Sequence, residues 1–556
     1  ALVASFFVPL VLLALLLKLL PALAAPLVGR ERANSATVFL LFAPLTLFNF
    51  TPGRVDHHNW EILIAGFGIL GLGHLSSENF GWRFAVPLAL SFACGLWIGT
   101  EALPWLILCL GCLAFAGAWY GGYVLRNGAV FGVALAMIVA AIFPLAIARE
   151  QYSDLALSWF SLADVIFACL AGGVLGLAWF FGRLMARRAL RLLLVSALGL
   201  IACALFFRLV PEAAKGPFAD FDGFNSTVSL ENIGEAVPLA SVLKVHFYNH
   251  LTYLRALMAF LRFLLLPVLG LTVVIYNVLR GQAAQRMLWV FHGVFLLAAT
   301  LLAFLWQSRA GWFMEMFAIA PLTWLAVTGW QRIKERFAGK ARVFAGLGAF
   351  LLLAPLPVLL LPAAVNGTAF YPNILLFPAA RPLTTACPLT AAASYIAGPW
   401  GYIDRPYMIL AAADDGPELL FRTRDNVIAA NFNVPGNRDV FDFFNARDDE
   451  VALNVLRKWH VDLVLTCRTI APFYAGLDHP KFGANVFLLN GADGKLHLGG
   501  DPDHRALLEK LINGQTPDWL QPVEIPNVKD YLLYEVKLPE THGADQDKPR
   551  QPGKSS

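Results

Sequence analysis

The segment Thr51-Pro-Gly-Arg-Val-Asp56-His57-His58-Asn59-Trp60-Glu61 sets a carboxylate and two imidazoles side by side between two apolar runs. A carboxylate and an imidazole this close in sequence can both reach a divalent cation, and such a cation can neutralise a phosphate leaving group. We therefore predict Asp56 and His58 as ligands of a Mg²⁺ or Mn²⁺ ion, with His57 as a weaker candidate because side-chain alternation turns it away. The alternative is a polar loop that only caps helix ends.

Two other charged residues stand near apolar runs. Arg309 follows Trp306-Gln307-Ser308, and Glu235 lies in a long polar segment, residues 211–252. A guanidinium binds phosphate in a forked geometry and does not lose its proton, which makes Arg309 a candidate phosphate ligand. The alternatives are an interface anchor for Arg309 and a solvated loop acid for Glu235.

The elements that must position these residues are hydrophobic helices. The chain has 556 residues, of which 58% are hydrophobic and 14% are charged, against roughly a quarter charged in soluble domains. Since a spanning helix needs about 20 apolar residues, the sequence predicts about twelve spans, near residues 2–24, 35–50, 61–75, 84–100, 102–122, 129–148, 160–182, 190–210, 254–279, 287–306, 311–330 and 343–364. The net charge of +4 gives no reason to expect a nucleic-acid partner.

The basic residues predict the orientation of these spans. Alternate connections are rich in arginine and lysine and are assigned to the cytoplasm, namely Arg30, Arg32, Arg83, Arg126, Arg183, Arg187, Arg188, Arg191, Arg280, Arg286, Arg332, Lys334, Arg336, Lys340 and Arg342. The loops 51–61 and 211–252 then face outward. We predict a multi-pass protein of the bacterial inner membrane, with one further helix expected before residue 1 because both ends otherwise lie outside.

The chain after residue 365 has the composition of a soluble protein. We predict that residues 366–539 form a periplasmic α/β domain and that residues 540–556 form a disordered tail. Its predicted elements are strands 427–431, 461–466 and 531–538 and helices 449–459 and 503–512, with Asp448 as a cap. Cys387 and Cys467 are the two cysteines of this part, and in the periplasm they are free to form a disulfide.

Several of these residues carry a family resemblance. Asp56-His57-His58 followed by Glu61 resembles the second acidic motif of archaeal oligosaccharyltransferase catalytic subunits, which have the GT-C glycosyltransferase fold. Asn232-Ile-Gly-Glu-Ala-Val-Pro238 resembles the T-I-x-E segment of that family's long outer loop, and Arg309 matches an arginine that meets the lipid-linked phosphates. With one helix added before residue 1, both outer loops fall where the family has them among its thirteen spans.

The resemblance implies roles for these positions. Asp56 and His58 would hold the metal, Glu235 would approach the metal and the acceptor amide, and Arg309 would bind the donor phosphates. The family's first catalytic aspartate, in a loop after its first helix, has no counterpart in this chain.

The soluble part matches the family's order of strand, helix and strand, at Asn431-Phe-Asn433, Asp448-Asp-Glu-Val-Ala452, Leu456-Arg-Lys458 and Val461-Asp-Leu-Val464. It departs from the family where the sequon-reading motif W-W-D-Y-G stands, because this chain has Ala412-Ala-Asp-Asp-Gly416. Asp414 keeps an acceptor-side position, but both indoles are absent.

The predicted function is a GT-C-like membrane glycosyltransferase, comprising a transmembrane domain of residues 1–365 and the soluble domain. It would transfer a sugar from a polyprenyl-phosphate or polyprenyl-diphosphate donor to a periplasmic glycan, lipid or protein that is not an N-glycosylation sequon. One alternative is a true oligosaccharyltransferase acting on protein asparagine. Another is a transporter or lipid-handling protein, which would concentrate its charges at mid-membrane rather than at the outer face.

Overall fold

The structure is a computed structural model that describes residues 2–52, 54, 57–77, 81–216, 238–240, 253–353, 389–398, 406–413, 415–430, 434, 436–467, 488–490, 496–498, 506–528 and 531–538. The chain divides into two compact units, a helical unit that ends with helix α16 and a C-terminal unit that begins with helix α19.

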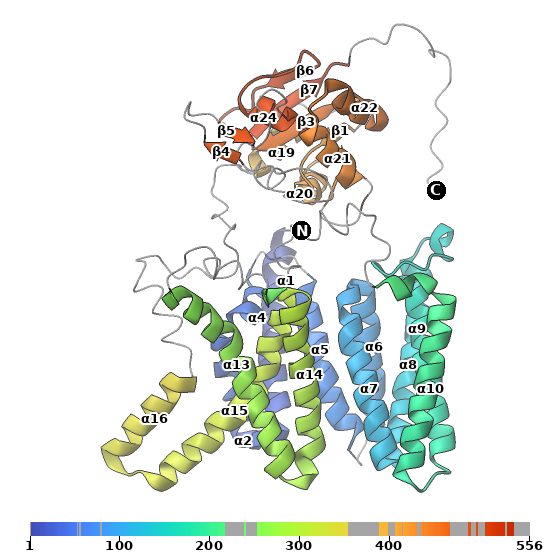
Figure 1. Cartoon of the computed structure of the whole chain (residues 1–556), viewed down its shortest axis with the longest axis vertical. Coiled ribbons are helices and arrows are strands. Elements are labelled where there is room, and N and C mark those ends of the chain that lie inside the picture. The colour runs from blue at the N-terminus through green and yellow to red at the C-terminus, as the bar shows by residue number, and fades with distance from the viewer. Residues whose placement is uncertain are drawn as a thin grey trace. The chain divides into compact units, whose positions relative to one another are not determined.

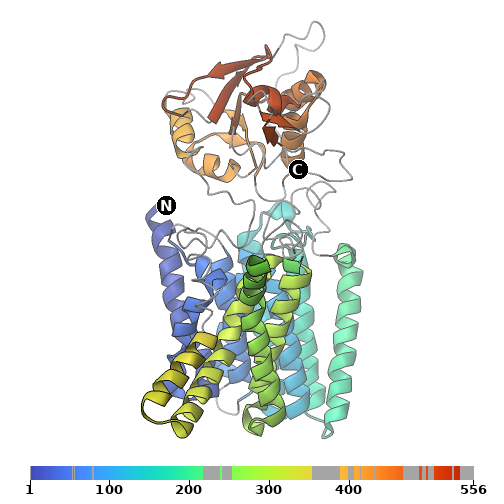
Figure 2. The ribbon, with the colours of Figure 1, turned by 60° about the vertical axis from the view of Figure 1, so that its left-hand side comes forward.

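Long helices build the first unit, and they run alongside one another (Figure 1). They are α1 (Leu2–Val28), α5 (His58–Leu75), α6 (Trp82–Ile98), α7 (Leu103–Tyr120), α8 (Gly122–Ala146), α9 (Leu162–Gly182), α10 (Arg188–Leu209), α13 (Tyr253–Arg280), α14 (Arg286–Leu305), α15 (Gly311–Arg336) and α16 (Gly339–Leu353). Helix α10 has no buried residue and stands at the edge of the bundle (Figure 2). Such an outward apolar surface is typical of a helix that faces lipid.

Seven helices of the described residues are long and apolar enough to cross a membrane, and two shorter apolar helices, at residues 82–98 and 264–280, accompany them. The prediction of a multi-pass membrane protein is therefore confirmed. The predicted number of twelve spans stays a prediction.

The predicted span at residues 35–50 is wrong as a continuous helix. The chain forms three short pieces there, α3 (Ala36–Phe39), η1 (Leu40–Phe42) and α4 (Pro44–Phe48). The break is at Ala43, with φ −112° and ψ 65°, because the residue before a proline is disfavoured in the helical region. An apolar run predicts burial, but it does not reveal that Pro44 restarts the helix.

A buried acid makes this broken segment possible. Oε2 of Glu315, in α15, accepts hydrogen bonds from the backbone N–H groups of Leu45 (2.7 Å) and Thr46 (3.1 Å). The Thr46 hydroxyl donates to the Trp312 carbonyl at 2.7 Å. The first N–H groups of a helix lack partners within it, so Glu315 satisfies at long range the donors that the restart at Pro44 creates.

This contact predicts a stability effect. Glu315→Ala leaves two buried N–H groups without their acceptor, at a cost of about 2 kcal/mol or more, so the thermal unfolding midpoint in detergent is expected to fall clearly. Glu315→Gln keeps an acceptor oxygen and is the matched control, with a smaller expected decrease. Equal midpoints for wild type and Glu315→Ala would contradict this role.

Aromatic packing joins three of the helices whose ends form the site described below. Trp105 of α7 lies 4.5 Å from Phe313 and 5.3 Å from Phe317, both in α15, measured between ring centroids. Phe317 in turn meets Phe295 of α14 at 5.4 Å. Trp105, Phe295 and Phe317 are fully buried, and close-packed interiors of this kind hold side chains in single positions.

The C-terminal unit contains a five-stranded mixed sheet in the order β2-β1-β3-β7-β6. Its strands are β1 (Met408–Leu410), β2 (Asn426–Val427), β3 (Leu463–Cys467), β6 (Leu520–Val523) and β7 (Tyr531–Val536). Strands β2 and β3 both run parallel to β1, and β7 pairs antiparallel with β3 and β6. The other elements are α19 (Leu389–Ala397), α20 (Gly416–Arg422), α21 (Gly436–Asn445), α22 (Asp449–Trp459), α24 (Leu507–Ile512) and the hairpin of β4 (Leu488–Asn490) and β5 (Leu496–Leu498).

The predicted helix at residues 449–459 is confirmed at both ends as α22. The predicted cap is also formed: an Asp448 side-chain oxygen accepts a hydrogen bond from the Glu450 N–H at 3.0 Å. The predictions at residues 461–466 and 531–538 correspond to β3 and β7. Strand β1 and helices α20 and α21 were not predicted. Strand β1 and helix α20, of three and seven residues, are too short for a clear hydrophobic period. Helix α21 has such a period, since its apolar residues Val440, Phe441, Phe443 and Phe444 are buried, and it was overlooked. Cys467 of β3 takes part in a disulfide; Cys387 lies outside the described residues, so the predicted pairing stays a prediction.

Candidate metal and phosphate-binding site

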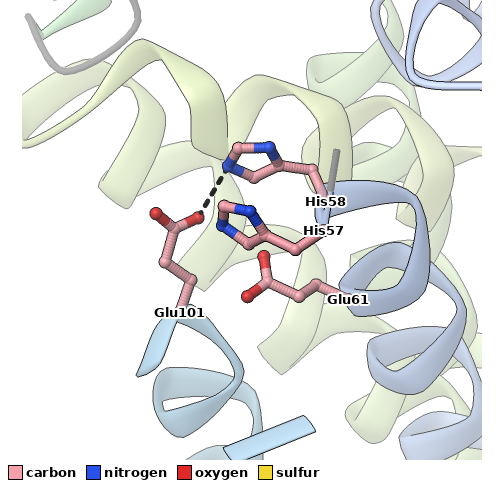
Figure 3. Close-up of side chains that lie close together, drawn as sticks. All are labelled: His57, His58, Glu61 and Glu101. Carbon is pink, nitrogen blue, oxygen red and sulfur yellow. Dashed lines mark ion pairs between the residues drawn. The ribbon is translucent and has the colours of Figure 1, made fainter. Parts of the chain in front are cut away.

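The ends of several helices meet at one end of the helical unit and bring together four potential metal ligands. His57 and His58 stand at the start of α5, Glu61 lies one turn further on, and Glu101 belongs to the short helix η2 (Thr100–Ala102) between α6 and α7. Each offers one ligand atom, and these atoms all lie within 4.8 Å of one another. Figure 3 shows His57, His58 and Glu61 from α5 facing Glu101 from the opposite chain segment.

Helical spacing explains why α5 and its N-cap residue His57 supply three of the four residues. Residues three and four apart share one face of a helix, so Glu61 follows His58 and His57 onto the same side. The two imidazole rings lie 4.0 Å apart between centroids, and the His58 ring meets Trp312 of α15 edge-on at 4.3 Å. The indole therefore holds the His58 ring against the cluster.

Arg309 joins the cluster through Glu101. It lies in the short helix η7 (Ser308–Ala310) between α14 and α15. Its Nη1 forms an ion pair with Glu101 Oε1, while Glu101 Oε2 lies 3.1 Å from His58 Nε2. One carboxylate thus contacts both the histidine and the arginine. The Arg309 Nε donates to Gln307 Oε1 at 2.7 Å, which fixes the guanidinium from a second side.

The residues of the cluster fit a divalent cation. Glu61 is fully buried, and neither of its carboxylate oxygens has a hydrogen-bond donor among the described residues. A buried charge without a partner is costly, and Glu101, the nearby acid, adds like-charge repulsion. Two imidazoles and two carboxylates form a mixed nitrogen and oxygen donor set of the kind that binds Mn²⁺ or Zn²⁺, whereas Mg²⁺ prefers oxygen ligands.

Gly99 allows the chain carrying Glu101 to approach α5. A Cβ added at Gly99 would lie 2.6 Å from Glu61 Oε1 and 3.1 Å from His57 Cδ2. Both are closer than ordinary van der Waals contact. A side chain at this position would have to displace ligand atoms of the cluster.

Gly99→Ala is therefore expected to weaken Mn²⁺ binding by about tenfold or more, as changes that misplace metal ligands do, with little loss of folded protein. Titration of the purified protein with Mn²⁺ measures the change. Gly111→Ala is the matched control, because a Cβ there meets nothing within 4 Å. Equal Mn²⁺ affinities for Gly99→Ala and wild type would show that the cluster does not depend on this close approach.

The structure places two of the predicted site residues next to the same carboxylate, since His58 and Arg309 both contact Glu101. Asp56, Glu235 and Asp414 lie outside the described residues, and their roles stay predictions. His57 is not turned away from the cluster: its ring offers a ligand atom that lies within 4.8 Å of those of the other three residues. Strand-like alternation does not apply there, because α5 begins at the next residue.

Sequence reasoning missed Glu101 and Gln307, and it used Glu61 only as part of a motif. A signal for Glu101 was present, because it is a lone acid between two apolar runs, and ionisable residues in such places are functional candidates. Glu61 could have been found from its helical spacing to His57 and His58. Nothing in the sequence distinguishes Gln307 from other polar residues at helix ends.

No family model matches the chain, and no curated protein matches it. Solved structures do. An archaeal oligosaccharyltransferase AglB from Archaeoglobus fulgidus, in complex with an inhibitory peptide and a dolichol-phosphate, aligns with a TM-score of 0.67 at 15% identity, over 93% of this chain and 68% of that one.

Two further structures of an oligosaccharyltransferase from the same organism align over 93% of this chain. One is tethered with an acceptor peptide containing the NVT sequon (TM-score 0.66, 15% identity, 67% of that chain), and one is in complex with zinc and sulfate (TM-score 0.64, 14% identity, 66% of that chain). The chain therefore has the fold of the archaeal oligosaccharyltransferases.

Proposed function

We propose that the protein is a membrane glycosyltransferase. It takes a sugar from a polyprenyl-phosphate or polyprenyl-diphosphate carrier and passes it to an acceptor at the outer face of its membrane. The observation that carries the proposal is the shared carboxylate of Glu101, which contacts Arg309 on one side and His58 on the other. A potential metal site and a phosphate-binding cation thus adjoin, as departure of a phosphate leaving group requires.

Metal binding and phosphate binding fall to different residues of the site. His57, His58, Glu61 and Glu101 would hold a divalent cation, with Asp56 as a further ligand. Such a cation, when bound, supplies charge neutralisation at the departing phosphate. Arg309, held by Gln307, would bind the phosphate oxygens and orient them. We assign Glu235 to the acceptor and the cation, and Asp414 to the acceptor side.

The comparisons support this division. Structures with the same fold were obtained with a dolichol-phosphate and with zinc and sulfate, which are a lipid-linked phosphate, a divalent cation and a tetrahedral anion. The chemistry of the cluster suits the same three classes of ligand.

The distribution of basic residues supports the outer face. Helix α15 begins at the cluster and ends with Lys334 and Arg336, and α14 begins with Arg286 and ends at the cluster. At the far end of α7, Arg191 donates to the Ala118 carbonyl at 2.9 Å. Since arginine and lysine collect on the cytoplasmic side, we assign the cluster to the opposite, periplasmic side.

We further propose that the acceptor is a glycan, a lipid or a protein chosen without a sequon. Ala412 stands where the family has an indole, and only 6% of it is exposed. A Cβ on Gly416 would lie 2.0 Å from the Ala429 carbonyl oxygen, which explains why the glycine of the motif remains. The second candidate, a true oligosaccharyltransferase, is supported by the fold alone.

The test uses the purified full chain in lipid nanodiscs with a radiolabelled sugar on a polyprenyl diphosphate. Mn²⁺-dependent release of sugar from the carrier, abolished by a chelator and by Arg309→Ala, is the expected result. Movement of intact donor across the bilayer without bond cleavage would instead indicate the transporter or lipid-handling alternative.

A further inference from the structure

Arg309, which we propose binds the donor phosphate, is already paired with the carboxylate of Glu101. Two nitrogens of the guanidinium have partners: Nη1 pairs with Glu101 Oε1, and Nε donates to Gln307 Oε1. The arginine and glutamate side chains are 17% and 22% exposed. An ion pair this sheltered is screened less by water than a surface pair, so the negative charge of Glu101 opposes an incoming phosphate at Arg309.

The opposite side of Glu101 faces the candidate metal ligands. Its Oε2 lies 3.1 Å from His58 Nε2, and one of its carboxylate oxygens belongs to the set of ligand atoms within 4.8 Å that includes Glu61. Glu61 is the buried acid with no hydrogen-bond donor among the described residues. With Glu61 and Glu101 both ionised, their two negative charges exceed the single positive charge of Arg309, and a cation is drawn to Glu101 from this side.

We propose that Glu101 is a positioning residue that makes cation binding the precondition for phosphate binding at Arg309. While the cluster holds no cation, Glu101 neutralises Arg309 and repels phosphate. When a cation also binds the Glu101 carboxylate, the attraction between Glu101 and Arg309 weakens. The guanidinium can then bind phosphate. The inference rests on the proposed function, and it adds an order of binding in which the cation comes first and the lipid-linked phosphate second.

Linkage makes the inference measurable without turnover, because two ligands that assist each other do so by the same factor in both directions. Farnesyl phosphate serves as the probe, with inorganic phosphate in parallel to separate recognition of the phosphate from recognition of the isoprenoid tail. Each is titrated against the purified full chain in nanodiscs, with and without Mn²⁺. Wild type is expected to bind farnesyl phosphate about tenfold more tightly when Mn²⁺ is present.

Whether Glu101→Gln strengthens or weakens binding of farnesyl phosphate decides between the two roles of Glu101. Glu101→Gln keeps the shape but removes the charge that restrains Arg309, so binding of farnesyl phosphate without Mn²⁺ is expected to rise by about tenfold and to become insensitive to Mn²⁺. A merely structural role for Glu101 predicts the opposite, weaker binding under both conditions. Gln307→Ala is the matched control, because it removes the other partner of Arg309 without removing charge, and it should weaken binding with and without Mn²⁺. Unfolding midpoints confirm that each variant is folded.

The outcomes separate the two proposals. If wild type binds farnesyl phosphate equally well with and without Mn²⁺, the order of binding is wrong, whereas the phosphate site at Arg309 stands. If wild type binds no phosphate under either condition and Arg309→Ala changes nothing, the proposed function itself is wrong. If binding without Mn²⁺ falls in Glu101→Gln, Glu101 supports the fold of the site and does not restrain Arg309.

Discussion

His58→Ala is expected to lower sugar transfer by about a hundredfold or more, the effect of removing a group that stabilises charge in the transition state. His58 is only 3% exposed, is held by Trp312 and contacts Glu101, so its imidazole has a fixed place in the cluster. Asp56→Ala is expected to act in the same direction. The measurement is the initial rate of sugar release from the lipid-linked donor at saturating Mn²⁺.

The control for this experiment lies on the same helix. His74, near the far end of α5, stacks on Phe84 with ring centroids 3.7 Å apart. His74→Ala removes an imidazole from α5 without touching the cluster and should leave transfer within a few-fold of wild type. Transfer that survives in His58→Ala but not in His74→Ala would mean that α5 matters only through its packing.

A fluorescent Asn-x-Thr peptide is expected to be neither bound nor glycosylated, even with donor and Mn²⁺ present. An indole pair offers a rigid apolar surface and two N–H donors, and Ala412 and Ala413 offer neither. Asp415, the next described residue, is buried, with both carboxylate oxygens 3.4 Å from the Tyr531 hydroxyl. Loss of contacts that read a side chain costs a few kcal/mol of discrimination, enough to remove useful selection of a sequon.

A peptide with Gln in place of Asn gives the baseline for this assay. Donor consumption with native membrane extract as acceptor shows that the enzyme is active. Glycosylation of the Asn-x-Thr peptide above the Gln baseline would contradict the prediction and favour the true oligosaccharyltransferase.

The sequence predicted the parts of this protein that depend on local pattern. Long apolar runs predicted the membrane helices, and the regular hydrophobic spacing of residues 449–459 predicted α22 with both ends correct. Arg309 and His58 were predicted because guanidinium suits phosphate and imidazole suits a metal ion, and because both residues match motifs of the family that the chain resembles. These inferences need only residue type and spacing within one element.

What the sequence could not predict depends on contacts between distant segments. The break at Pro44 is stabilised by Glu315, about 270 residues away in the chain, and no local pattern joins the two. Glu101 likewise acquires its significance only when η2 comes against α5 and η7, so that a lone acid becomes the residue between a histidine and an arginine.

Electron paramagnetic resonance of bound Mn²⁺ tests most directly the claim that this cluster is a cation site. Wild type is expected to bind a single Mn²⁺ ion whose pulsed spectrum shows coupling to imidazole nitrogen, because His57 and His58 are in the ligand set. The double variant His57→Ala/His58→Ala should lose that nitrogen coupling and most of the affinity. Wild-type protein that binds no Mn²⁺, or a double variant with an unchanged spectrum, would contradict the assignment of the cluster and the function built on it.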